Sequence, residues 1–248
     1  MSATQLLVPA VAAFAAGMLN GVAGGGSFLS FPALVFAGVP PISANATNNA
    51  AMWVGTIGSA RGYREDVREN RSLLLPVLVT SAVGSLIGAL LLLHTPQALF
   101  VHLIPWLLLF ATLLFAVSPL LRRRTERAPG HAPWQIAAQF AVAIYGGYFG
   151  AGMGILMLAV LAFSGLPSLN AQNAIKNVLA VAINGVALVP FVLARIVDWR
   201  FAVPMAALAL AGGYFGARLF RRLPQPVSRA VVIIIGVGMT MVFFARSF

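Results

Sequence analysis

NGVAGGGSFLSFPALVFAGVPPISANATNN, from Asn20 to Asn49, determines the architecture of this chain, because the same arrangement returns from Gly146 to Asn177 as GGYFGAGMGILMLAVLAFSGLPSLNAQNAIKN. Each copy has a glycine cluster, an apolar run, a proline turn and a segment rich in amides. The two copies keep a register of 125 to 128 residues, about half the chain. Paired apolar segments that are interrupted by glycine are typical of the binding site of a secondary transporter.

The composition is that of an integral membrane protein. Of 248 residues, 60% are hydrophobic and 8% are charged, a balance that soluble domains do not have. A weaker, more polar span covers residues 44–60, and apolar runs of about the length of a membrane-spanning helix lie at residues 6–23, 73–93, 98–121, 134–149, 172–194, 201–218 and 229–245. The runs lack the ten-residue alternation of barrel strands. The sequence therefore predicts an all-α, polytopic transmembrane bundle.

Two homologous repeats are expected to build this bundle. The first repeat covers residues 1–121, a charged linker covers residues 122–133, and the second repeat covers residues 134–248. The linker holds four arginines and the Pro129-Gly130 pair, which favours a loop. Depending on how the glycine-broken or re-entrant segments cross, the repeats supply 8 to 10 spans.

Arginine clusters bear on the topology, since they mark cytoplasmic loops. They lie at residues 61–71, 122–127 and 218–229. If residues 134–164 cross the membrane once, the repeats are parallel and the third cluster lies outside. If the segment is broken near Gly150, the repeats are inverted and all three clusters lie inside. Unbroken, these 31 residues would form a helix of about 46 Å, far longer than the bilayer needs, which favours the break.

The two glycine clusters are candidate anion sites. A helix that begins at such a break presents backbone N–H groups and the positive end of its dipole, which bind an anion without a charged side chain. Close packing of helices through small residues is the alternative explanation. The candidate binding residues here are Asn20, Gly24, Gly25, Gly26, Ser27, Gly150, Gly152 and Gly154.

Amides that follow the proline turns form the second candidate group. They are Asn45, Thr47, Asn48 and Asn49 in the first copy, and Asn170, Gln172, Asn173 and Asn177 in the second. Asn45 and Asn170 have a second interpretation as helix caps. The others continue into the helix at spacings of three and four residues, which places them on shared faces. Amides inside a membrane need partners, and a polar pocket between the repeats would supply them.

Lys176 is the single lysine of the chain and lies within an apolar segment. Such a residue costs about 2.5–3.5 kcal/mol to insert and suggests a functional site, although a snorkelling lysine would reach the interface. All five acidic residues lie in loops, and there is no cysteine. Cation transport and acid–base or thiol catalysis are therefore disfavoured, and the sequence predicts neither an enzyme nor a cofactor or metal site. The net charge of +11 reflects topology rather than nucleic-acid binding.

The run from Gly17 to Ala60 and its second copy resemble the sulfite exporter TauE/SafE family of bacterial membrane proteins. The resemblance covers nearly the whole chain. It implies a multi-pass permease of the bacterial inner (cytoplasmic) membrane for sulfite, sulfoacetate, sulfonates or related small anions, in either direction. The second copy has Met153 and Ile155 where the first has glycine and Ser27, so the two breaks are expected to contribute unequally.

The function expected is secondary transport of a small anion by alternating access, with Lys176 offsetting the charge of the anion near mid-membrane. An anion channel is the first alternative. A membrane enzyme or a membrane subunit that transports nothing is the second. The expected partners are the small anionic substrate and the lipid bilayer, with no nucleic acid, and the sequence leaves a homo-oligomer open.

Overall fold

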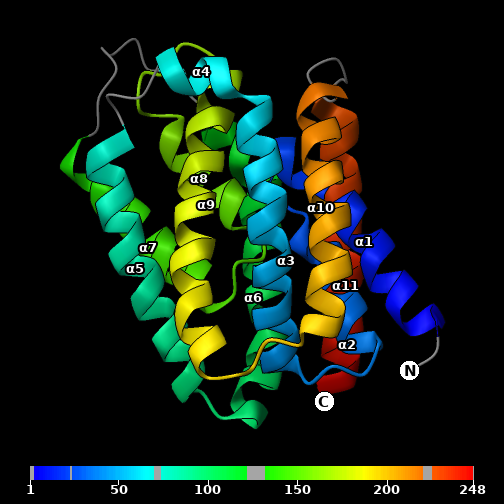
Figure 1. The fold of residues 1–248 in the computed structure, drawn as a ribbon. Helices are drawn as coiled ribbons and strands as arrows, with labels where there is room; N and C mark the ends of the chain where they lie inside the picture. Colours follow the sequence, from blue (N-terminus) through cyan, green and yellow to red (C-terminus); the bar gives the residue numbers. More distant parts are fainter. Residues whose placement is uncertain (1–2, 23, 70–73, 122–131, 220–224, 248) are drawn as a thin grey trace.

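Helices make up the regular structure of the chain in a computed structural model, which describes residues 3–22, 24–69, 74–121, 132–219 and 225–247 (Figure 1). These residues form eleven helices and no strands. Three of the helices are long and apolar enough to cross a membrane by length and composition alone, at Leu74–His94, Gln97–Leu114 and Leu169–Leu193. The all-α bundle predicted from the composition is confirmed.

Two helix pairs are broken at the glycine clusters. The first pair is α1 (Ala3–Val22) and α2 (Ser27–Phe36), and the second is α7 (Pro133–Tyr148) and α8 (Met153–Leu161). Gly24, Gly150 and Gly152 have φ angles of 81°, 75° and 76°, a left-handed conformation that glycine adopts without strain. In Figure 1, α1 begins and α2 ends toward one end of the bundle, whereas α7 begins and α8 ends at the other.

Six longer helices run along the bundle. They are α3 (Pro41–Gly62), α5 (Leu74–His94), α6 (Gln97–Leu121), α9 (Leu169–Leu193), α10 (Trp199–Leu219) and α11 (Gln225–Ser247). Their bounds lie within a few residues of the apolar runs in the sequence, because apolar length decides where such helices begin and end. A short helix, α4 (Arg64–Glu69), lies at one end in a stretch that the sequence suggests is a loop.

Helices from the first half of the chain pack against helices from the second half. We call α1, α2, α3, α5 and α6 the first series, and α7 to α11 the second. Helix α10 packs against α1 and α3, while α5 packs against α7 and α9. Helices α3 and α9 contact each other, as do α6 and α11. Corresponding helices run in opposite directions in Figure 1, so if the two series are repeats, they are inverted. Their homology stays a prediction.

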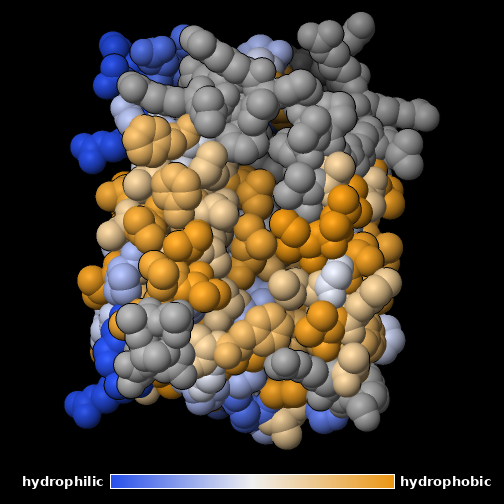
Figure 2. Space-filling view, turned by 90° about the vertical axis from the view of Figure 1, so that its right-hand side faces the viewer, coloured by the Kyte–Doolittle hydropathy of each residue, from blue (hydrophilic) through white to orange (hydrophobic). Residues whose placement is uncertain are grey.

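One end of the bundle carries α4, and we call it the α4 end. Helices α7 and α11 begin there, and α6 and α10 end there (Figure 1). Arg61, Arg64 and Arg68 are exposed at this end. The arginines at 122–127, and the arginine side chains at 218–229, lie outside what the structure describes. The helices that flank both clusters nevertheless meet this end. This arrangement matches the alternative in which the segment near Gly150 is broken. In Figure 2 a hydrophobic belt crosses the middle of the face, with hydrophilic residues along the lower edge and at the upper left.

Candidate functional site

The two glycine breaks touch at the centre of the bundle. A Cβ atom built on Gly24 would lie 2.6 Å from the Cα atom of Gly154, and one built on Gly154 would lie 2.7 Å from the Cα atom of Gly24. Such distances leave no room for any side chain at either position. The small-residue packing considered from the sequence is therefore present, and it places the starts of α2 and α8 beside each other.

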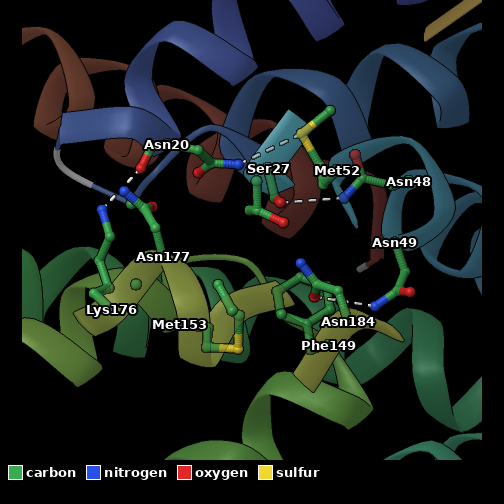
Figure 3. Close-up of a pocket in the computed structure, with 15 residues that line it drawn as sticks. Asn20, Ser27, Asn48, Asn49, Met52, Phe149, Met153, Lys176, Asn177 and Asn184 are labelled. Carbon is green, nitrogen blue, oxygen red and sulfur yellow. Dashed lines mark hydrogen bonds between the residues drawn. The ribbon is translucent and has the colours of Figure 1, made fainter. Parts of the chain in front are cut away.

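A cavity of about 30 Å³ lies against this contact (Figure 3). It has contributions from both breaks and from α3 and α9. Nine of the residues singled out in the sequence line it: Asn20, Gly24, Ser27, Asn48, Asn49, Gly150, Gly154, Lys176 and Asn177. A water needs about 10–15 Å³ of such space, so the cavity has room for only a few atoms. The described residues of its lining include one lysine and no carboxylate.

Lys176 is 1% exposed and reaches the end of the first half-helix. Its Nζ donates a hydrogen bond to the backbone oxygen of Asn20 at 2.8 Å. Asn20 lies in the last turn of α1, where the carbonyl groups form the negative end of the helix dipole. The ammonium is therefore bonded to the negative end of a helix. The snorkelling alternative is wrong, because this side chain is buried inside the protein.

Asn20 bonds the turn that leads into the second helix of the first pair. Its Oδ1 accepts a hydrogen bond from the backbone N–H of Gly26 at 2.8 Å, and its Nδ2 lies 3.5 Å from the Sδ of Met52. A Cβ on Gly26 would lie 2.1 Å from the backbone oxygen of Ala16. Gly26 thus has a structural reason to be glycine, and its N–H group is already bonded rather than directed at the cavity.

Asn48 connects α3 to the start of α2. Its Nδ2 donates to the Oγ of Ser27 at 3.2 Å, and its Oδ1 accepts from the Oγ of Ser30 at 2.6 Å. Asn49, on the next position, donates from Nδ2 to the Oδ1 of Asn184 on α9 at 3.2 Å. These bonds fix the two amide-bearing helices around the cavity, as the dashed lines in Figure 3 show.

Asn177 is the polar side chain of the cavity that is left unsatisfied. It is fully buried, and neither its Nδ2 nor its Oδ1 has a hydrogen-bond partner among the described residues. The Oδ1 of Asn49 lacks a partner as well. A buried polar group without a partner costs about 1–3 kcal/mol. In Figure 3, Asn177 lies beside Lys176, so an ammonium group and an amide without a partner lie together at this wall of the cavity.

Eight of the candidate residues do not line the cavity: Gly25, Gly26, Asn45, Thr47, Gly152, Asn170, Gln172 and Asn173. Asn45 donates from Nδ2 to the backbone oxygen of Tyr148 at 2.9 Å. The Oγ1 of Thr47 accepts from the backbone N–H of Asp198 at 2.9 Å. Asn170 is exposed, and Asn173 is buried with an Oδ1 that lacks a partner.

The capping interpretation of the two asparagines is wrong. Helix α3 begins at Pro41 with Pro40 before it, so Asn45 lies inside the helix. Helix α9 is capped by Ser168, whose Oγ accepts from the backbone N–H of Ala171 at 3.1 Å. Proline fits the first helical position because it has no N–H to satisfy, and serine is a preferred cap.

The cavity is also lined by six residues that the sequence did not indicate: Met52, Thr56, Phe149, Met153, Ala180 and Asn184. Two of them carry a signal in the sequence. Thr56 follows Asn49 by seven residues, and Asn184 follows Asn177 by seven. Seven residues are about two helical turns, so both extend the polar faces that were already recognised. The apolar four have no such signal.

A family model described as sulfite exporter TauE/SafE matches residues 9–243. The chain belongs to this family. A TauE/SafE relative from Escherichia coli K12, the probable membrane transporter protein YfcA, is 30% identical over 92% of this chain and 85% of its own length. A probable membrane transporter protein of Haemophilus influenzae is 27% identical over 92% of this chain and 89% of its own.

A third relative of this TauE/SafE chain, the probable membrane transporter protein ORF9 of a Sinorhizobium species, is 26% identical over 93% of this chain and 89% of its own. No solved structure matches. The family and the names of these relatives make this TauE/SafE protein a membrane transporter.

Proposed function

We propose that this protein is a secondary transporter that carries a small anion, sulfite or an organosulfur anion, by alternating access. The observation that carries the proposal is the charge of the central cavity, which has Lys176 in its lining and no carboxylate. Two unit charges 4 Å apart attract by about 4 kcal/mol at an effective dielectric constant near 20. An anion in the cavity would gain this attraction, whereas a cation would be repelled.

The residues around the cavity would divide the work of binding. Lys176 supplies the charge, and the amide of Asn177 is available to the anion because none of the described residues bonds it. Asn48 holds Ser27 at the start of α2, where the dipole of the helix is positive. Asn20 acts indirectly, since its side chain accepts from the N–H of Gly26 just before α2 and its backbone oxygen accepts from Lys176.

Contact between the two breaks supports a carrier over an open channel. Gly24 and Gly154 meet backbone to backbone beside the cavity, so the path is closed at the centre in this conformation. In a carrier of this kind the two breaks would move apart alternately toward each end. By the positive-inside rule, the exposed arginines of the α4 end support a cytoplasmic position for that end in a bacterial inner membrane.

Flux into proteoliposomes tests the proposal. Purified protein is reconstituted and offered sulfite, sulfoacetate, taurine and thiosulfate, with and without a pH gradient. We expect saturable flux of at least one anion, and its loss in Lys176→Ala and Asn48→Ala. Flux that rises linearly without exchange would indicate a channel, and no flux of any anion would indicate a subunit that does not transport. Unchanged flux in both variants would overturn the site.

A further inference from the structure

A second group of buried polar side chains lies between α5, α7 and α9, outside the central cavity. Ser81 and Ser85 are one turn apart on α5, and Gln135 and Gln139 are one turn apart on α7. Gln135 is 3% exposed and the other three are fully buried. Polar side chains inside a membrane protein are costly and mark pathways more often than packing.

These side chains bond one another only in part. Gln139 donates from Nε2 to the Oγ of Ser81 at 3.0 Å, and Ser85 donates from Oγ to the backbone oxygen of Ile183. The Nε2 of Gln135 and the Oε1 of Gln139 have no partner among the described residues. One is a donor and the other an acceptor, one helical turn apart on the same helix, so ordered water between them would satisfy both.

The group runs from the surface toward the cavity. Gln135 lies in the first turn of α7, whose backbone start it caps, and α7 begins at the α4 end (Figure 1). Gln139 and Ser81 lie about one turn deeper, and Ser85 lies another turn along α5. Ile183, which accepts from Ser85, directly precedes Asn184 in the wall of the central cavity. We define these four side chains, Ser81, Ser85, Gln135 and Gln139, as the polar file.

We propose that the polar file holds a chain of water molecules that joins the α4 end to the central cavity. The ligand is water rather than the transported anion, because the two atoms without a partner among the described residues are a neutral donor and a neutral acceptor, which water can satisfy together. The helices pack tightly beside the file: a Cβ on Gly88 would lie 2.0 Å from the backbone oxygen of Ile144, and one on Gly147 would lie 2.1 Å from that of Ser85.

The corresponding seam of the other series differs. Gly17 and Gly212 bring α1 and α10 together, and a Cβ on either would lie within 2.4 Å of a backbone oxygen of the other helix. The hydroxyls of Thr56 and Ser59 on α3 donate to carbonyl groups of α3 itself. Among the described residues, α1 and α10 carry no buried side-chain atom without a partner, whereas α7 carries two. Water would therefore reach the cavity along α7, from the α4 end.

Cysteine reactivity tests the polar file without knowledge of the transported substrate, and so independently of the proposed function. The chain has no cysteine, so Ser81→Cys and Ser85→Cys each give a single thiol. Only the thiolate reacts, and a thiol in dry apolar surroundings stays protonated. Membranes are treated with Ag⁺ for increasing times, the protein is unfolded, and the remaining thiols are counted with a maleimide. Ala13→Cys, at a fully buried apolar position on α1, is the matched control.

We expect both serine variants to react with Ag⁺ at least ten times faster than Ala13→Cys. Equal rates would overturn the proposal, and because two variants are used, poor folding of one leaves the other to decide. Gln139→Leu in the Ser85→Cys background then tests continuity. Gln139→Leu should slow the reaction of Cys at position 85 with Ag⁺ about tenfold, because it closes the polar file between that position and the α4 end. An unchanged rate would mean that water reaches Ser85 from the cavity alone, which would also overturn the joined file.

Discussion

The two glycine breaks at the centre of the bundle differ in backbone conformation and in the side chains that bond them. Gly26, just before α2, has a φ of −60°, whereas Gly152, just before α8, has a φ of 76°. At the first break, the side chain of Asn20 accepts from the N–H of Gly26. At the second, the hydroxyl of Tyr145 donates to the backbone oxygen of Ala151 at 2.6 Å. The breaks therefore share their glycine pattern but neither their backbone path nor their polar contacts.

The half-helix ends that lead into the breaks show the same difference. Each is met by a side chain from the long helix of the other series. Lys176 on α9 donates to the backbone oxygen of Asn20 on α1, and Asn45 on α3 donates to that of Tyr148 on α7. A full charge therefore meets the end of α1, and a neutral amide meets the end of α7. The ends of the two half-helices therefore differ in the charge of the side chain that meets them.

The contact between the breaks is expected to give the largest effect. Gly24→Ala would force a left-handed φ of 81° on alanine and drive its Cβ into Gly154. Strain of about 1–2 kcal/mol for the φ angle and about 1–3 kcal/mol for overpacking add up to a severe loss of folded protein. Gly38→Ala is the matched control, since Gly38 has a φ of 93° but open space around it. Thermal unfolding in detergent, followed by size-exclusion chromatography, measures both.

If Gly38→Ala lost as much stability as Gly24→Ala, the φ angle alone would explain the effect. The contact between the two breaks would then not be what holds the centre of the bundle together.

The role of the Lys176 charge in transport is tested by Lys176→Met, which keeps the length of the side chain and removes the ammonium. We expect saturable anion flux to fall at least a hundredfold, equivalent to about 2.7 kcal/mol, because the anion would lose its counter-charge in a region of low dielectric. Arg64→Met removes an exposed cation from α4 and should leave flux unchanged. Equal flux in the Lys176 variant and the parent would show that the asymmetry of charge has no role in transport.

The sequence predicted the helices well and the neighbours of individual side chains poorly. Apolar length and glycine breaks are local properties, so the bounds of α5 or α9 follow from them. Which amides reach the cavity depends on how α3 and α9 face each other, and no local pattern contains that information. Asn48 and Asn177 line the cavity, whereas Asn45 and Asn170, chosen on the same grounds, do not. The partner of Lys176 was equally hidden, because a backbone carbonyl leaves no trace in a sequence.

Two amides distinguish residues that bind from residues that hold the fold. Neither polar atom of the Asn177 side chain has a partner in the part of the chain that the structure describes, so Asn177→Leu removes an unsatisfied group and should leave stability unchanged or raise it by about 1 kcal/mol. Anion flux should nevertheless fall about tenfold. Asn45 does have a partner, so Asn45→Leu should lower stability by about 1–2 kcal/mol. Unfolding temperatures and initial flux rates, measured side by side, separate the two outcomes. A clear loss of stability in Asn177→Leu would mean that its amide is bonded within the protein.

The starts of α3 and α9 provide the smallest test, because the two series begin their long helices differently. Helix α3 starts with Pro41 and has no side-chain cap, whereas α9 is capped by Ser168. Ser168→Ala removes one hydrogen bond at the helix start and should cost about 1 kcal/mol, which lowers the unfolding temperature of a chain of this size by about 2–4 °C. Asn170→Ala, two residues on and exposed, should change it by less than about 0.5 kcal/mol. Flux should be the same in both variants, since neither residue lines the cavity. If Asn170→Ala lowered the unfolding temperature more than Ser168→Ala, Asn170 rather than Ser168 would stabilise the start of α9. The amides at equivalent positions of the two series would then both serve stability.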